Sequence, residues 1–223
     1  MNCGGLSTRI YLNNRFFNCT VVKILVFGDS IAWGAYDTEA GGWVERLKTF
    51  FLKSYEKKGV GIYNFSVSSN DTRGVLHFLQ HDISKLDEIE QEDKILLFSM
   101  GSNDARHADN KTQLYIPEKE FQCNLTAIVK IAKKHSSTII FTGLLKVDEQ
   151  ITLPWNTIDS WNNKDIQHYN SIIESFCKKE KLHFIPFWNL LSAKDLADGL
   201  HPNSKGHKKI YRKVKQYLLP SLV

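Results

Sequence analysis

Several patterns that would place the chain in a common class are missing from its 223 residues. No apolar run reaches the roughly 18 residues that cross a bilayer, because Lys23 and Lys53 interrupt the two most apolar early segments. Residues 1–20 contain Arg9 and Arg15 but no continuous apolar stretch that leads to a small-residue cleavage site. We therefore expect a cytoplasmic protein without stable membrane insertion.

Cysteine is scarce, and its spacing suggests no motif. The four cysteines form no C-x-x-C pair, so neither a zinc ribbon nor a redox motif is indicated. We interpret Cys3, Cys19, Cys123 and Cys177 as free thiols in a reducing compartment.

The common nucleotide and hydrolase motifs are also missing. There is no G-x-G-x-x-G and no Walker A segment, which removes the usual sequence support for dinucleotide or nucleoside triphosphate binding. No two glycines are four residues apart, so the G-x-S-x-G elbow of the α/β-hydrolases is absent. No H-E-x-x-H pattern occurs, and we interpret the histidines other than His201 as structural or surface residues.

Acidic residues are absent from residue 199 onward, where six Lys or Arg residues occur. The rest of the chain is nearly neutral, so the net charge of +5 comes from this one segment. Its apolar positions Ile210, Val214, Tyr217 and Leu218 indicate an amphipathic helix with a solvated basic face, and we expect no nucleic-acid partner. Binding of an anionic ligand or a nucleic acid through this helix stays open as an alternative.

Short apolar runs alternate with segments of helical period along the chain. This pattern predicts an α/β fold with a five-stranded, mostly parallel sheet between helices. The expected strands span residues 21–27, 61–65, 94–100, 138–142 and 182–186. The expected helices span residues 43–55, 73–86, 117–135, 163–179 and 204–218. No linker or change of composition divides the chain, so we expect one domain over residues 21–223 with residues 1–20 as an N-terminal extension.

Two loops, 102–116 and 146–160, are too long for simple connections, and both follow predicted strands. In open α/β sheets, ligands bind outside the carboxyl ends of the strands. We therefore expect the functional residues at that edge of the sheet.

Ser30 follows the first predicted strand in the segment Gly28-Asp29-Ser30. A serine at a strand end and a helix N-terminus is placed to attack a bound acyl group, with backbone N–H groups nearby for the resulting oxyanion. Capping of the next helix is an equally good reading of these three residues alone.

Asp198 and His201 lie three residues apart near the other end of the chain. A histidine that reaches Ser30 could remove its proton, while the aspartate could hold the imidazole in the useful tautomer. Pro202 and Asn203 could instead simply set up the last helix. The pair is a candidate for catalysis because it occurs in the same chain as Ser30.

Two further polar segments follow strands. Asn103 lies in Gly101-Ser102-Asn103-Asp104, and its amide could donate a hydrogen bond to a developing oxyanion. An ordinary turn is the alternative, since these residue types favour turns. Residues 64–72 could supply a backbone N–H donor in the same way.

Together and in this order, the four segments resemble the SGNH hydrolases, also called the GDSL esterase/lipase family, over about residues 21–218. The resemblance implies a three-layer, flavodoxin-like fold and ester hydrolysis through an acyl-serine, with no metal and no other cofactor. It implies Ser30 as nucleophile, His201 as base and Asp198 as the partner of His201. The backbone N–H of Ser30 and the side chain of Asn103 would bind the oxyanion.

The second segment departs from the family pattern, which usually has a glycine whose N–H joins the oxyanion hole. An ungapped comparison places Ser69 there. A serine still offers the N–H, but a position with positive φ suits it poorly, and Asn70 would tolerate that conformation after a shift of one residue. We prefer Ser69 and keep Asn70 as the alternative.

The substrate is less determined by the sequence. Trp33 and Trp155, with Leu153, Pro154 and Trp161, could form an apolar wall for an acyl group or a platform for a sugar, or could cover the core. We expect a small-molecule ester: a short-chain acyl ester, a lysophospholipid or an acyl thioester. A carbohydrate O-acetyl ester and a non-catalytic binding module of the same fold are the alternatives. The oligomeric state is not readable from the sequence.

Overall fold

A five-stranded parallel sheet forms the centre of the computed structural model, which describes residues 22–53, 59–87, 93–108, 113–156 and 158–222. The strand order is β2-β1-β3-β4-β5, as in doubly wound folds of the flavodoxin type. The strands are β1 (Val22–Gly28), β2 (Val60–Asn64), β3 (Asp93–Ser99), β4 (Thr138–Thr142) and β5 (His183–Ile185). The predicted α/β fold with a parallel sheet is therefore confirmed.

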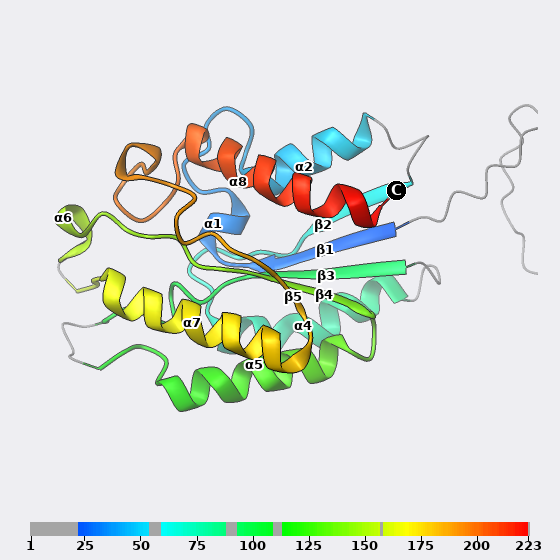
Figure 1. Cartoon of the computed structure of the whole chain (residues 1–223), viewed down its shortest axis with the longest axis horizontal. Coiled ribbons are helices and arrows are strands. Elements are labelled where there is room, and N and C mark those ends of the chain that lie inside the picture. The colour runs from blue at the N-terminus through cyan, green and yellow to red at the C-terminus, as the bar shows by residue number, and fades with distance from the viewer. Residues whose placement is uncertain (1–21, 54–58, 88–92, 109–112, 157, 223) are drawn as a thin grey trace, which may run out of the picture.

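Helices cover both faces of the sheet and complete three layers (Figure 1). One face carries α1 (Ser30–Trp33), α2 (Trp43–Leu52) and α8 (Ser204–Leu218), and the other carries α4 (Thr72–Asp87), α5 (Glu118–Ala132) and α7 (Asn163–Glu180). Short turns of helix α6 (Glu149–Thr152), η1 (Ala193–Asp195) and η2 (Leu219–Ser221) lie in the connections. Within the described segments, no helix has the length and apolarity to span a membrane.

The predicted strands and long helices are all present, with differences at their ends. The helix predicted over 43–55 ends at Leu52, and the one predicted over 117–135 ends at Ala132, where Lys133 caps it. Pro117 is the N-cap of α5 rather than its first residue, because its ψ of 145° is extended. Val21 and residues 54–58 lie outside the described residues. A helix begins at Ser30, as expected from the sequence, and forms the single turn α1. The single turn α6 was not predicted, because it is too short for helical periodicity to mark.

Buried side chains alternate between the two faces of the central strands. Leu25, Phe27 and Phe98 point to the cluster under α4, α5 and α7, whereas Ile24 and Val26 point to the cluster under α2 and α8. Both faces of β1 and β3 are therefore buried, which explains why these strands are continuous apolar runs in the sequence.

A row of stacked phenylalanines crosses the first of these faces. The Phe98 ring lies 5.5 Å from that of Phe27 and 5.0 Å from that of Phe141, and Phe27 stacks on Phe65 at 5.3 Å. Phe27, Phe98 and Phe141 occupy matching positions on β1, β3 and β4. This row joins the three strands whose carboxyl ends form the polar edge described below.

Replacement of Phe98 by alanine should remove about 3–5 kcal/mol from the free energy of unfolding, because the side chain is fully buried in this row. Phe98→Leu leaves a smaller cavity and should lose less. Phe78→Ala on the exposed side of α4 is the control, and denaturant titration measures all three. A loss for Phe98→Ala no larger than that of the control would contradict the assigned packing.

Candidate active site

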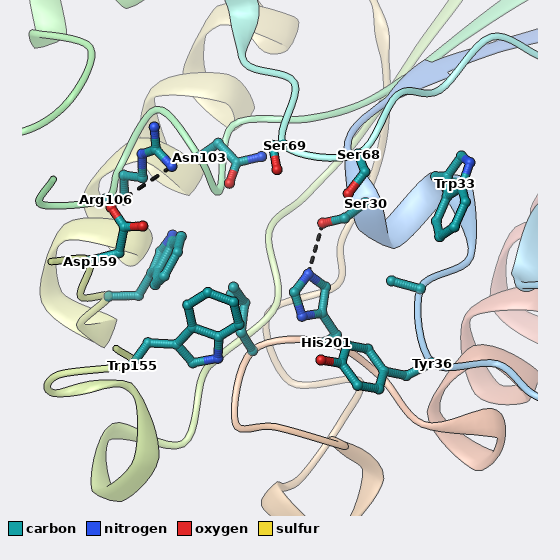
Figure 2. Close-up of a pocket in the computed structure, with 13 residues that line it drawn as sticks. Ser30, Trp33, Tyr36, Ser68, Ser69, Asn103, Arg106, Trp155, Asp159 and His201 are labelled. Carbon is teal, nitrogen blue, oxygen red and sulfur yellow. Dashed lines mark hydrogen bonds and ion pairs between the residues drawn. The ribbon is translucent and has the colours of Figure 1, made fainter. Parts of the chain in front are cut away.

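A cavity of about 400 Å³ opens at the carboxyl edge of the sheet, where the sequence places its polar segments. Figure 2 shows the side chains around it. Its lining comes from the loops after β1, β2, β3 and β4 and from the segment before α8: Ser30, Trp33, Ala35, Tyr36, Ser68, Ser69, Asn103, Arg106, Trp155, Asp159, Trp161, Leu200 and His201.

Ser30 is the first residue of α1, directly past the end of β1. Glycine at position 28 lets the end of β1 pack closely against β3, because a Cβ there would lie 2.4 Å from the Ser99 carbonyl oxygen. The helix is capped by Asp29, whose carboxylate accepts from the Ile31 N–H at 2.9 Å, so the reading of Ser30 as a cap is wrong. Burial raises the pKa of Asp29 to about 6, against the opposing effect of that hydrogen bond.

His201 joins Ser30 to Asp198. Its Nε2 lies 2.8 Å from Ser30 Oγ, and its Nδ1 lies 2.8 Å from Asp198 Oδ2 (Figure 2 shows the first contact). Burial alone would raise the pKa of Asp198, but hydrogen bonds from the His201 ring and backbone hold it at about 2. A charged carboxylate at Nδ1 favours the tautomer with the proton on Nδ1, which leaves Nε2 to accept the Ser30 hydroxyl proton.

Ser69 and Asn103 face Ser30 across the cavity (Figure 2). Ser69 has a φ of 65°, the left-handed conformation that favours glycine. Within the described part of the chain, the backbone N–H groups of Ser30 and Ser69 have no acceptor. The Asn70 N–H donates to the Val67 carbonyl at 3.2 Å, so of the two predicted alternatives only Ser69 has a free N–H.

Asn103 is oriented by the neighbouring loop. Its Nδ2 donates to the Asn70 carbonyl at 2.8 Å, which uses one of the two amide hydrogens and leaves the other. Next to it, Asp104 accepts from the N–H and hydroxyl of Thr72, and the Asn124 amide donates to the same hydroxyl. These bonds fix the loop that carries Ser69 against the loop that carries Asn103. Burial raises the pKa of the Asp104 carboxyl to about 7.

Aromatic side chains form the walls. Trp155 meets Trp161 edge to face at 5.4 Å, and the Trp161 Nε1–H donates to the Ser102 carbonyl at 2.9 Å. Trp33 is 56% exposed and lies on the opposite side of the cavity (Figure 2). The structure thus places both predicted wall residues, Trp33 and Trp155, at the cavity, together with Trp161.

Leu153 and Pro154 were predicted to belong to the same wall, but they are not among the residues that line the cavity. Leu153 is 48% exposed. The turn that follows α6 directs Trp155 inward and leaves Leu153 at the surface.

The lining side chains that were not predicted include Tyr36, Arg106 and Asp159. Arg106 lies 4.0 Å over the Tyr115 ring and pairs with Asp159 at 3.9 Å (Figure 2). Arg106 and Asp159 belong to the two long loops expected to hold functional residues, although nothing in the sequence distinguishes them within those loops. No sequence pattern marks Tyr36. No three His, Cys, Asp or Glu side chains in the described ranges are grouped in a way that could hold a metal ion.

The model of the GDSL-like lipase/acylhydrolase family matches residues 26–209, which include all four polar segments. A comparison with curated proteins gives no match.

Solved structures with the same fold include lipolytic enzymes and esterases. A lipase/acylhydrolase from Enterococcus faecalis is 20% identical, with a TM-score of 0.70 over 90% of this chain and 97% of that one. An acetylxylan esterase from Geobacillus stearothermophilus is 18% identical, with a TM-score of 0.69 over 88% and 94% of the two chains. A lipolytic protein of the G-D-S-L family from Veillonella parvula is 16% identical, with a TM-score of 0.65 over 88% and 97%. At these identities the likeness shows the fold.

The free energy of unfolding of Asp104→Asn should rise relative to that of the unchanged protein as the pH rises from about 4 to above 7. The carboxyl binds its proton more tightly in the folded chain, with a pKa of about 7, than at its ordinary value of 3.8. The stabilising contribution of this carboxyl is therefore fully present below about pH 4 and is lost as the pH rises through about 7. Asparagine does not titrate, so its contribution does not change with pH. Denaturant unfolding at pH 5 and pH 8 should show the difference in unfolding free energy grow by at least about 1 kcal/mol.

The exposed Asp93 supplies the matched control, Asp93→Asn. A pH-independent difference for Asp104→Asn, equal to that of the control, would show that Asp104 ionises freely in the folded protein.

Proposed function

The chain belongs to the GDSL-like lipase/acylhydrolase family and is an esterase of that type, and on this premise we propose that it hydrolyses carboxylic esters through an acyl intermediate on Ser30. The observation that carries the proposal is the continuous hydrogen-bonded chain from Ser30 through His201 to Asp198, with 2.8 Å at each step. The chain ends at a serine that lines the cavity.

In the proposed reaction, His201 Nε2 takes the hydroxyl proton of Ser30 while Oγ attacks the ester carbonyl carbon. Asp198 stabilises the imidazolium that forms. The tetrahedral intermediate then collapses: the bond to the alcohol oxygen breaks, and His201 returns the proton to that leaving oxygen. Water, deprotonated by the same nitrogen, then attacks the acyl carbon. The bond to Ser30 Oγ breaks, His201 returns the proton to Oγ, and the acid is released.

The oxyanion would be bound by the N–H groups of Ser30 and Ser69 and by the second amide hydrogen of Asn103. Their lack of an acceptor within the described chain supports this assignment, since such donors are useful only when free and already oriented. The free donors also weigh against a purely non-catalytic binding module. Serine at position 69 retains the backbone N–H that the usual glycine of the family would supply.

The Geobacillus acetylxylan esterase adds support for the roles of the side chains. Its catalytic mutants replace a serine, an aspartate and a histidine, and the last two are three positions apart in that protein. Asp198 and His201 have the same separation, and the serine likewise lies near the start of the fold.

A short acyl group fits the cavity best. Its described lining has one aliphatic side chain larger than alanine, Leu200, beside four aromatic rings and seven polar or charged residues, which gives little apolar length for a long acyl chain to bury. This composition disfavours a lysophospholipid and favours a short-chain ester.

A carbohydrate O-acetyl ester is the second candidate. Trp33 and Trp155 offer aromatic faces, and Ser68, Arg106 and Asp159 offer hydrogen-bonding groups at the same cavity, a combination suited to a polar ring.

Four further statements stay predictions from the sequence. They are a cytoplasmic location, a single domain over residues 21–223, the absence of a cofactor and the absence of a nucleic-acid partner.

Turnover of p-nitrophenyl esters from acetyl to long acyl chains should be highest at the short end and should fall at least about 10³-fold in Ser30→Ala, which removes the nucleophile but little packing. Acetylated xylo-oligosaccharides assayed beside the series separate the two candidate alcohols. Full activity in a correctly folded Ser30→Ala would refute the acyl-serine route, and an optimum at long chains would refute the short acyl site.

Ser69→Gly should keep kcat/KM within about threefold of the unchanged protein or raise it, because glycine adopts the φ of 65° without steric cost and retains the N–H. Ser68→Gly, at a neighbouring lining residue, is the comparison. A loss of more than about tenfold in Ser69→Gly alone would assign the role to the Ser69 hydroxyl instead of its backbone.

A further inference from the structure

Tyr36 is held in a backbone conformation that bulky residues rarely adopt, with a φ of 64°. Both neighbours are anchored. The Ala35 carbonyl accepts from Nε2 of the buried His207 at 2.8 Å. The Asp37 carboxylate accepts from Arg46 at 2.8 and 2.9 Å. Anchoring on both sides explains how the unfavourable conformation persists next to Ser30.

This conformation brings the Tyr36 side chain onto the histidine. The two rings lie 5.3 Å apart at an interplanar angle of 31°, and Figure 2 shows Tyr36 beside His201. The Tyr36 hydroxyl lies on the side of Asp198, and the negative charge of that carboxylate raises the pKa of the phenol. One side chain thus lies against the His201 ring and acts on the carboxylate that orients it.

Asp198 has the capacity to accept a hydrogen bond from the phenol. Its Oδ1 accepts from the N–H groups of Leu200 and His201 at 3.0 and 2.8 Å, and its Oδ2 accepts from the His201 ring. An ionised carboxylate has about four acceptor sites, so one remains for the phenol. On another side of the imidazole, Trp155 meets it edge-on at 6.1 Å.

We propose that Tyr36 is a positioning residue for the His201–Asp198 pair: its ring holds the plane of the imidazole and its hydroxyl fixes the carboxylate that orients it. This inference rests on the proposed function, in which His201 is the general base. A phenol hydrogen bond also shares the negative charge of Asp198. Its removal therefore leaves more of that charge to stabilise the protonated imidazole.

Among the described residues, Asp29, ahead of α1, and His207, on α8, are further titratable groups that act on His201. Both are buried and are not in the set of substitutions below, so their influence is common to every variant compared.

Three variants test the proposal with the best p-nitrophenyl ester. Tyr36→Ala removes ring and hydroxyl, and we expect kcat to fall about tenfold or more with KM within about twofold. Tyr36→Phe restores the ring and should recover most of kcat, while the acidic limb of its kcat/KM profile moves to higher pH by about 0.3–1 unit. Tyr63→Phe, which removes a phenol hydroxyl on β2, should match the unchanged protein.

A raised KM at unchanged kcat in Tyr36→Ala would make Tyr36 a substrate-contacting wall residue and overturn the proposal. An acidic limb in Tyr36→Phe that coincides with that of the unchanged protein would overturn it as well.

An NMR titration of the His201 ring separates this inference from the proposed function, because it needs no turnover. The titration midpoint should move to higher pH in Tyr36→Phe and stay in place in Tyr63→Phe. A midpoint that does not move overturns the positioning role even in an active esterase. Retained turnover in Ser30→Ala would refute the acyl-serine route and leave the titration result intact.

Discussion

The hydrogen bond between Ser30 and His201 joins two segments that are 171 residues apart, and most of the fold is needed to form it. Ser30 is positioned by β1, which lies between β2 and β3 in the sheet. His201 is positioned by the segment before α8, which packs on the same face as α2. A hydroxyl to imidazole contact tolerates only a few tenths of an ångström of displacement. The site therefore depends on the packing of the whole α2–α8 layer.

His207 shows how that layer is locked together. It is fully buried, donates to the Ala35 carbonyl from Nε2 and accepts from the Trp43 N–H at 3.3 Å through Nδ1. Burial lowers its pKa, and protonation would remove the acceptor for Trp43. One neutral imidazole thus connects α8, the loop after α1 and the start of α2. The same helix that follows His201 also fixes the loop beside Ser30.

The sequence was informative where a single physical requirement controls a run of residues. Strands buried on both faces must be apolar throughout, so β1 and β3 could be located within about two residues. Ser30, Asn103, Asp198 and His201 could be found because each follows or precedes such an element in a recognisable order. The structure places Ser30, Asn103 and His201 at one cavity, and Asp198 lies behind His201.

The sequence could not predict the residues whose positions depend on an unusual backbone conformation or on a tertiary contact. From the sequence, a positive φ at Ser69 could be named only as a condition to be tested, because no neighbouring residue type requires it. Tyr36 owes its position to anchors at His207 and Arg46, which are far from it in sequence or in a different element. The pair of Arg106 and Asp159 forms between two long loops whose relative placement no periodicity encodes. Such contacts are decided by the assembled fold rather than by local pattern.

Three aspartates of the polar segments show how position alone separates groups of identical chemistry. Burial raises the pKa of Asp29 to about 6 and that of Asp104 to about 7, whereas the hydrogen bonds of Asp198 hold its pKa at about 2. Asp198, the carboxylate that contacts His201, is the one of the three whose surroundings favour the ionised form. The countercharge for an imidazolium at His201 is thereby concentrated on the Nδ1 side of the ring. That arrangement leaves Nε2 directed at Ser30, where it is placed to accept the hydroxyl proton.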